Sequence, residues 1–149
     1  MPERIRGIRF SRYEPGMLYG NHVDNAIMGK SDRWRSDVSF TIFLSDPADY
    51  DGGELVIEST LGAQAVKVAS GAALVYPSST VHRVAEVTRG QRLAAIGWVQ
   101  SQVRDPAQRE ILYDLERIKR LMAERLPDVP ETDWAFKTQA NLLRMWADP

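Results

Sequence analysis

The sequence predicts a mainly β fold, a sandwich or barrel of antiparallel sheets, followed by α-helices. Short apolar runs with the composition of strands occupy residues 1–104, and glycines and prolines separate them at regular intervals. From residue 105 onward, apolar residues recur every three or four positions, which is the period of a helix. The 149 residues are enough for one domain with a substantial core and too few for two.

The predicted β part begins with an extended pattern over residues 5–18. A Pro15-Gly16 turn signal lies within it, so we expect a hairpin that leads to Tyr19 and His22. The polar residues 29–35 predict a loop that shapes substrate entry, and residues 46–53 predict a turn. A buried strand is expected at residues 38–44, with Val38, Phe40, Ile42 and Leu44 on one face, and further short strands at residues 55–57, 65–68, 72–76 and 93–99.

The predicted first helix starts at Asp105-Pro106, with the aspartate as N-cap and the proline at the first helical position. It ends at Leu126-Pro127, and Thr132 is expected to cap a second helix. We expect the apolar face of the first helix to pack on the sheets, with a dimer interface as the alternative; this face comprises Ile111, Leu112, Leu115, Ile118 and Leu121. Residues 1–104 are thus the predicted core, and residues 105–149 a helical extension packed on the same domain.

Composition and charge exclude several classes of function. The formal net charge of −1 draws the molecule neither to nucleic acid nor to an anionic membrane, so we expect neither as a partner. The chain has no cysteine, which excludes disulfides, thiolate nucleophiles and cysteine-ligated metals. There is no apolar run of signal-peptide length and none near the ~20 residues of a membrane span. We therefore expect a cytoplasmic protein.

The only two histidines of the chain and one aspartate form a candidate metal site. His22 and Asp24 would point to the same face of a strand, and His82 would complete the site. Two imidazoles and one carboxylate on one side of a metal leave the opposite positions open, which is typical of non-haem Fe(II) enzymes that use dioxygen. Two unrelated surface histidines are the alternative, and a zinc hydrolase is a weaker one because the nearby sequence offers no evident general base.

Several segments resemble the PKHD-type hydroxylases, in the prolyl-4-hydroxylase-like branch of the Fe(II)- and 2-oxoglutarate-dependent dioxygenases. The resemblance covers most of the chain. It is carried by His22-Val23-Asp24-Asn25, Asp51-Gly52-Gly53-Glu54-Leu55, Tyr76-Pro77, His82-Arg83-Val84 and Arg89-Gly90-Gln91-Arg92, and by residues 98–105 and 141–148. It implies that residues 1–104 form a double-stranded β-helix (jelly roll) that is the catalytic core, followed by C-terminal α-helices.

The resemblance also implies roles for single residues. His22, Asp24 and His82 would be the iron ligands. Arg92 would hold the distal carboxylate of 2-oxoglutarate, because a guanidinium can form two parallel charge-assisted hydrogen bonds to a carboxylate. Arg89 is the rival candidate, but it lies next to a glycine in an apparent turn. A surface salt bridge is the alternative role for either arginine.

Aromatic residues supply the remaining candidates. Tyr13 and Tyr19 resemble positions that face the pocket in related enzymes, and each would either bind cosubstrate or substrate through its hydroxyl or pack on the sheet. Some related prolyl hydroxylases carry a 2-oxoglutarate-binding tyrosine at the position of Phe43, so this chain would need another donor. The four tryptophans are expected to be core or helix-packing residues; they are Trp34, Trp98, Trp134 and Trp146.

The implied function is Fe(II)- and 2-oxoglutarate-dependent hydroxylation, by dioxygen, of an aliphatic C–H bond in a small-molecule or peptidyl substrate, such as a prolyl residue or a related amino acid. Ascorbate is the implied reductant for the iron. The alternative is a non-catalytic metal-binding jelly-roll module, a sensor or an inactive truncated relative. Family members usually have several tens of residues before the strand at residues 10–13. We therefore expect an uncovered sheet surface that favours homo-oligomers.

Overall fold

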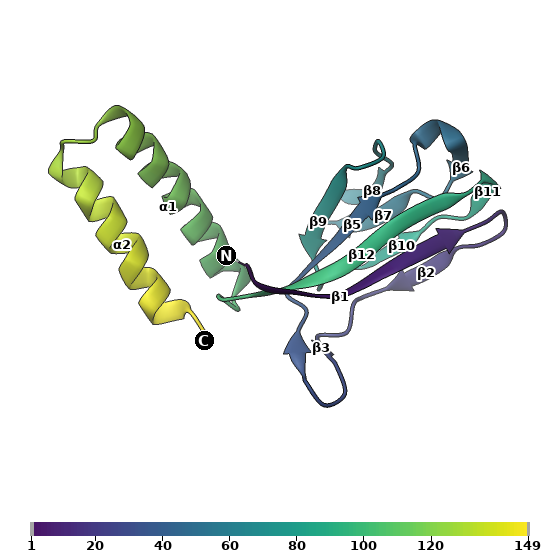
Figure 1. Cartoon of the computed structure of the whole chain (residues 1–149), viewed down its shortest axis with the longest axis horizontal. Coiled ribbons are helices and arrows are strands. Elements are labelled where there is room, and N and C mark those ends of the chain that lie inside the picture. Colours follow the sequence, from purple (N-terminus) through teal and green to yellow (C-terminus); the bar gives the residue numbers. More distant parts are fainter. Residues whose placement is uncertain (1, 149) are drawn as a thin grey trace. The chain divides into compact units, whose positions relative to one another are not determined.

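The computed structural model describes residues 2–148, which form two compact units. The first unit, residues 2–100, is built mainly of β-strands, and the second, which begins at Ser101, contains two α-helices (Figure 1). The predicted mainly β fold with C-terminal helices is confirmed. The packing of the helices on the β unit stays a prediction. No helix among residues 2–148 is both long and apolar enough to cross a membrane.

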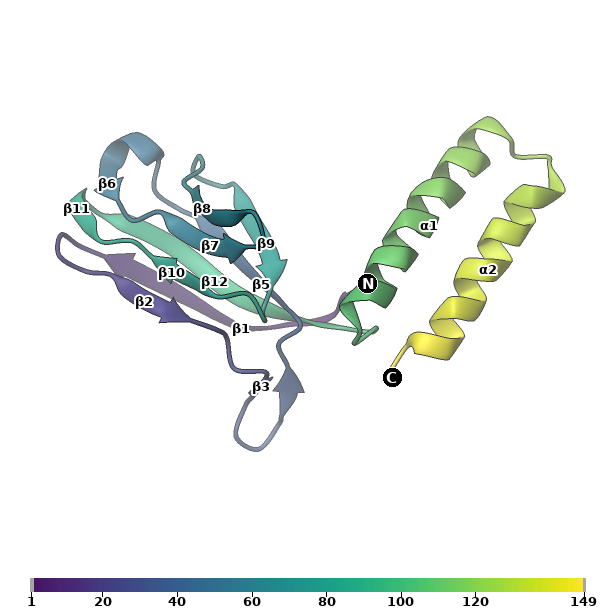
Figure 2. The same ribbon diagram turned by 180° about the vertical axis from the view of Figure 1, so that it is seen from behind.

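Two four-stranded sheets face each other in the β unit, as a jelly roll requires (Figures 1 and 2). The strand order of the first, here called the major sheet, is β1 (Pro2–Tyr13), β12 (Arg92–Ser101), β5 (Val38–Phe43) and β9 (Ala73–Pro77). The order of the second, the minor sheet, is β2 (Tyr19–His22), β10 (His82–Val84), β7 (Leu55–Ser59) and β8 (Gly62–Val66). Neighbouring strands are mostly distant in sequence, so long-range pairing builds both sheets.

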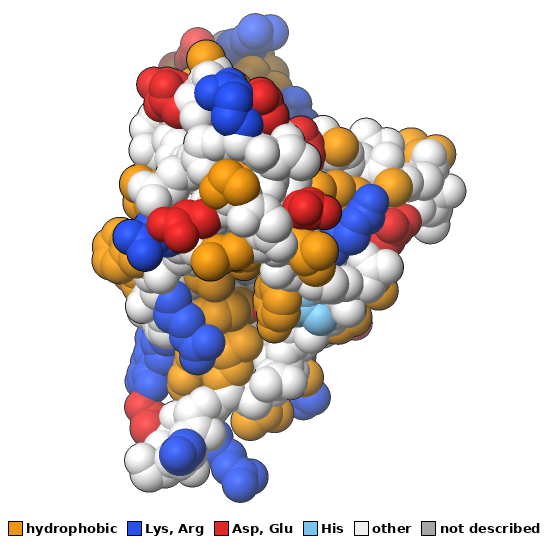
Figure 3. Space-filling view, turned by 90° about the vertical axis from the view of Figure 1, so that its right-hand side faces the viewer, with side chains coloured by type: hydrophobic (Ala, Val, Ile, Leu, Met, Phe, Trp, Pro, Cys, Tyr) orange, Lys and Arg blue, Asp and Glu red, His pale blue; other side chains and the backbone are white. Residues whose placement is uncertain are grey.

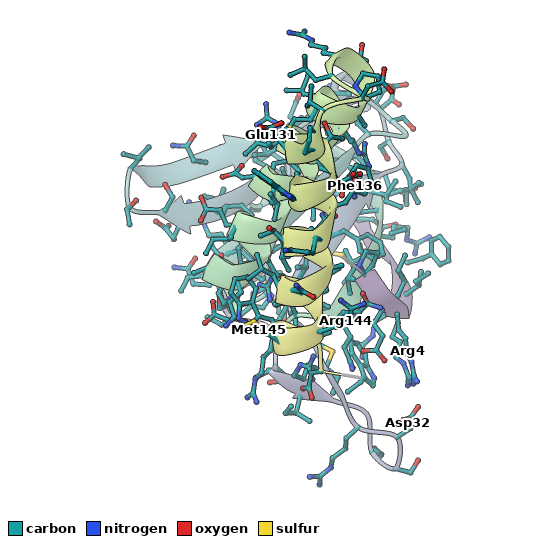
Figure 4. All side chains as sticks on the ribbon, turned by 90° about the vertical axis from the view of Figure 1, so that its left-hand side faces the viewer. Arg4, Asp32, Glu131, Phe136, Arg144 and Met145 are labelled. Carbon is teal, nitrogen blue, oxygen red and sulfur yellow. The ribbon has the colours of Figure 1, made fainter. Side chains whose placement is uncertain are left out.

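Two short strand pairs complete the unit. Residues 46–53, predicted to be a turn, instead form the 3-10 helix η1 (Pro47–Asp49) and the strand β6 (Tyr50–Gly52), which pairs with β11 (Val87–Gly90). The predicted loop of residues 29–35 is largely the connection between β3 (Ile27–Met28) and β4 (Trp34–Arg35). Asp32 lies in this connection (Figure 4).

The hairpin predicted for residues 5–18 is not formed. β1 belongs to the major sheet and β2 to the minor sheet, so the turn at Pro15-Gly16 leads from one sheet to the other. Backbone hydrogen bonds hold this turn on β11: Gly16 N donates to Val87 O (2.8 Å), and Val87 N donates to Met17 O (3.0 Å). The local turn signal was correct, but it does not determine which strands pair.

The two faces of β5 differ in burial. Ser39, Thr41 and Phe43 are buried, whereas the more apolar face, which carries Val38, Phe40 and Ile42, is only partly buried and is followed by an exposed Leu44. The register places Ser39 opposite Trp98 of β12. The more apolar face of this strand is therefore not the more buried one. The buried face carries the small polar side chains of Ser39 and Thr41 toward the interior of the β unit.

The outer face of the major sheet exposes apolar side chains. Ile8 and Phe10 of β1 and Val75 of β9 are all more than half exposed. An uncovered sheet surface that favours homo-oligomers stays a prediction.

In the helical unit, α1 (Pro106–Arg125) begins as predicted, since the Asp105 carboxylate accepts a hydrogen bond from Gln108 N (2.9 Å). The helix α2 (Pro130–Trp146) starts earlier than predicted. Its N-cap is Val129, and Thr132 instead donates its hydroxyl to Leu126 O (2.6 Å). Of the apolar face of α1, only Leu112 is buried. Trp134, expected to be packed, is 59% exposed.

Replacing the N-cap, Asp105→Ala, should lower the free energy of unfolding by about 1 kcal/mol, because the first turn of α1 loses the acceptor for Gln108 N. Urea denaturation followed by circular dichroism measures this change. Asp114→Ala, an exposed position within the same helix, is the control. Equal stability of Asp105→Ala and the unmodified chain would contradict the capping role.

Candidate metal centre

The minor sheet brings the two histidines side by side. In the antiparallel pair of β2 and β10, His22 and His82 are direct cross-strand partners, and their ring centroids are 4.2 Å apart. Asp24 follows two residues after the end of β2. One ligand atom from each of the three side chains lies within 4.8 Å of the other two. The structure thus brings together all three residues that the sequence predicted to bind a metal.

Backbone carbonyls orient both imidazole rings. His22 Nδ1 lies 2.9 Å from Gly20 O, and His82 Nδ1 lies 2.9 Å from Thr80 O. A carbonyl only accepts hydrogen bonds, so Nδ1 is the donor in each pair. In a neutral imidazole held this way, Nε2 presents the lone pair with which histidine binds a metal.

The carboxylate of Asp24 is held by the major sheet. Ser39 of β5 donates its hydroxyl to Asp24 Oδ2 (2.5 Å), and the same hydroxyl lies 2.7 Å from the hydroxyl of Ser78. Asp24 Oδ2 is 3.9 Å from His82 Nε2. A hydrogen bond from the opposite sheet therefore fixes the carboxylate beside the imidazole.

The three residues line a cavity of about 950 Å³ between the two sheets. Arg92, the first residue of β12, also lines it and is only 1% exposed. Among residues 2–148, no carboxylate lies within ion-pair distance of its guanidinium, and its Nε has no hydrogen-bond partner. A buried, unpaired guanidinium in a cavity suits an anionic ligand.

The rival arginine lies elsewhere. Arg89 is on β11, and its guanidinium forms an exposed ion pair with Asp51 (Nε to Oδ2, 2.6 Å). That pairing raises the pKa of Arg89 and lowers the pKa of Asp51. Arg89 is not among the residues that line the cavity. The geometry therefore favours Arg92 as the anchor for a bound anion.

Aromatic side chains surround the Arg92 guanidinium. Its Cζ is 5.5 Å from the ring centroid of Tyr13 and 5.4 Å from that of Phe43. Tyr19 also lines the cavity, with its ring centroid 4.0 Å from that of His22. Both candidate tyrosines thus face the cavity, and Phe43 offers only a ring face to the arginine.

Sequence reasoning missed two tyrosines near Arg92. Tyr50 is fully buried, and its hydroxyl has no hydrogen-bond partner among the described residues. Burial raises the pKa of Tyr76 to about 12, although a hydrogen bond with Thr41 and the charge of Arg92 act in the opposite direction. Tyr76 therefore keeps its phenolic proton at neutral pH and can donate a hydrogen bond. Burial also raises the pKa of Tyr13 and Tyr50, and the positive charge of Arg92 partly offsets this rise.

Two of the tryptophans that were expected to be core residues also line the cavity. Trp98 of β12 is buried and Trp34 of β4 is partly buried, with ring centroids 6.4 Å apart. The sequence contained one usable signal for this inner face, the alternation of Ser39, Thr41 and Phe43 in β5. This alternation does not stand out in the sequence, because the residues between them are apolar and give the strand two largely apolar faces.

These residues fit an Fe(II) ion and 2-oxoglutarate. Two imidazole nitrogens and one carboxylate match the two-histidine, one-carboxylate set of non-haem Fe(II) oxygenases. The guanidinium of Arg92, whose buried Nε is unpaired, is suited to bind the carboxylate at the far end of a dicarboxylic acid.

Comparison with known proteins agrees with this assignment. The family model of the 2OG-Fe(II) oxygenase superfamily matches residues 8–100. Among curated relatives, a PKHD-type hydroxylase of Gloeothece citriformis is 56% identical over 147 residues, and one of Synechococcus elongatus is 54% identical over 148. Each alignment covers 99% of this chain and 66% of the relative. The chain therefore spans slightly less than two thirds of the length of these relatives.

Solved structures show the same fold. A prolyl-4-hydroxylase of Pseudomonas putida superposes with a TM-score of 0.51 at 30% identity, over 62% of this chain and 51% of that one. An oxidoreductase of the 2OG-Fe(II) oxygenase family from Burkholderia pseudomallei gives a TM-score of 0.55 at 23% identity, over 65% of this chain and 44% of that one. The second likeness concerns the fold alone.

The protein should bind one Fe(II) per chain under argon, and Asp24→Ala should weaken this binding strongly because one of three ligands is lost. Isothermal titration calorimetry measures the affinity. Asp128→Ala, an exposed position between the two helices, should bind as the unmodified chain does. Undiminished binding by Asp24→Ala would contradict the ligand assignment.

The free energy of unfolding should decrease at alkaline pH because of Tyr76. The folded state holds its phenolic proton up to about pH 12, whereas the unfolded chain releases it near the ordinary pKa of 10.0. This contribution is complete below pH 10 and is lost as the pH rises to 12, an effect on the order of 2–3 kcal/mol. Urea unfolding at several pH values should show a shallower decline for Tyr76→Phe. Tyr113→Phe, at an exposed tyrosine on α1, should not flatten the curve.

Proposed function

Because the chain belongs to the 2OG-Fe(II) oxygenase superfamily, we propose that it is an Fe(II)- and 2-oxoglutarate-dependent dioxygenase that hydroxylates an aliphatic C–H bond. The observation that carries this proposal is the combination, in one cavity, of the His22, Asp24 and His82 cluster with the buried, unpaired Arg92. A metal-binding module without catalysis would need the cluster but not the arginine.

Each of these residues has a physical role in the proposed reaction. His22, Asp24 and His82 hold Fe(II), which together with 2-oxoglutarate supplies the activation of dioxygen. Arg92 binds the far carboxylate of 2-oxoglutarate and so orients the cosubstrate. Its burial excludes water and strengthens that charge pair. The neutral phenol of Tyr76, which lines the cavity, adds a hydrogen-bond donor, whereas Phe43, whose ring lies beside Arg92, offers none.

We propose a prolyl residue or a related amino acid, in a peptide or a small molecule, as the substrate. The 30% identity with the prolyl-4-hydroxylase of Pseudomonas putida supports this class. Ascorbate would keep the iron ferrous between turnovers. Ferrous iron persists in a reducing compartment, so we place the protein in the cytoplasm. Nucleic acid and membranes are not proposed as partners.

Anaerobic titration of the Fe(II)-loaded protein with 2-oxoglutarate tests the proposal. A weak visible charge-transfer band should appear, since a keto acid chelated to Fe(II) absorbs there. Arg92→Ala should need at least about tenfold more 2-oxoglutarate for the same absorbance, because hydrogen bonds to charged groups contribute about 1.5–3 kcal/mol. Arg89→Ala is the matched control and should titrate normally, because Arg89 is paired with Asp51 on the surface.

The absence of a band while iron is bound would favour the non-catalytic metal module. A normal titration by Arg92→Ala would show that another group holds the cosubstrate. In either case, the measured iron content separates a failure at the metal from a failure at the carboxylate anchor.

A further inference from the structure

A second group of cations lines the cavity away from Arg92. Gly7, Arg9, Ser11 and Tyr13 of β1 line the cavity from one face of the strand, and Arg6 lines it as well. Tyr13 lies beside Arg92, whereas Arg9, four residues earlier in β1, lies beside Trp98, its Cζ 5.5 Å from the ring centroid. At about 3.3 Å per residue, the strand spans roughly 13 Å between Tyr13 and Arg9. A five-carbon diacid anchored at Arg92 is too short to reach Arg9.

The charge at this outer end is not neutralised. Arg9, Arg6 and Lys30 line the cavity there, and Arg6 is paired with Asp32. No carboxylate of residues 2–148 lies within ion-pair distance of Arg9 or Lys30. The face of the molecule drawn in Figure 3 shows Lys and Arg side chains that border an apolar area, with a histidine close by. The acidic residue that lines the cavity, Asp24, is already assigned to the metal.

The aromatic wall supports the same interpretation. Trp98 is 6% exposed, and its indole Nε1–H has no acceptor among the described residues. An unsatisfied buried donor is costly unless a ligand completes it. Gly7, at φ +66°, approaches the rings closely, since a Cβ there would lie 2.9 Å from Trp98 Cε3. The indole beneath Arg9 restricts the guanidinium and so lowers the entropic cost of binding an anion.

We propose that Arg9, Lys30 and Trp98 form a second anion subsite, which binds the side-chain carboxylate of an acidic peptide, so that the protein hydroxylates peptides carrying Asp or Glu near the target residue. This inference rests on the proposed function and specifies its substrate class. The cavity of about 950 Å³ is at the upper end of ligand-pocket volumes and exceeds the need of a cosubstrate plus one free amino acid.

Fluorescence anisotropy with labelled peptides tests the subsite. The probes are short peptides with one central proline, flanked by glutamate, glutamine or lysine. They are titrated with the full chain under argon, both with and without Fe(II) and 2-oxoglutarate. The glutamate peptide should bind most tightly and the lysine peptide least, and the affinity of the glutamate peptide should fall as salt increases.

The double variant Arg9→Gln with Lys30→Gln should weaken binding of the glutamate peptide roughly tenfold and leave the glutamine peptide unchanged. Arg12→Gln is the matched control, because Arg12 lies on the same strand, is exposed and does not line the cavity. An unchanged unfolding midpoint in urea would show that the double variant is folded. Similar losses in Arg12→Gln would indicate non-specific attraction and overturn the proposal.

The other outcomes are equally decisive. Equal affinity for the three peptides, or no binding of any, would overturn the subsite. Free glutamate and unlabelled glutamate peptide are then compared as competitors of the labelled peptide. If both displace it at the same concentration, the site binds small acids, and the peptide assignment is overturned. Selectivity for glutamate that depends on Arg9, in a protein without the 2-oxoglutarate charge-transfer band, would support the subsite and reject the dioxygenase.

Discussion

The cross-strand pairing of His22 with His82 is the constraint on which the rest of the site depends. Strands β2 and β10 place both imidazoles on the same face of the minor sheet, and a shift of one residue would turn one ring to the other face. The register is irregular between His82 and Val84, where a bulge changes the partner spacing. Asp24, held by Ser39 of the major sheet, can complete the site because this pair presents both rings on one face.

The major sheet accepts polar groups in its interior to serve the same cavity. Buried Ser39 of β5 holds Asp24, and the buried guanidinium of Arg92 on β12 keeps an unsatisfied Nε. Such groups cost stability in an empty protein, and a ligand that pairs with them adds its binding energy to the folded state. The inner face of this sheet is therefore shaped more by what it binds than by packing.

Local patterns allowed part of this structure to be predicted. His22, Asp24 and His82 could be grouped because the chain has only two histidines, and Asp105 could be recognised because a helix cap depends on adjacent residues alone. The predicted hairpin was wrong because strand pairing is decided by distant segments. The roles of Tyr76 and Trp98 in the cavity could not be predicted for the same reason, since nothing in their neighbouring residues indicates that they line it.

The local hydrogen bonds of the two histidines also affect how the two sheet strands that carry them are stabilised. Each ring is oriented by a carbonyl only two residues earlier in its own segment, Gly20 or Thr80, and so needs no distant partner. The paired strands β2 and β10 are four and three residues long, which is too short for strong mutual stability. An ion shared by the two rings would act as a cross-link between these strands. Metal occupancy would thereby govern the rigidity of one edge of the minor sheet as well as the chemistry.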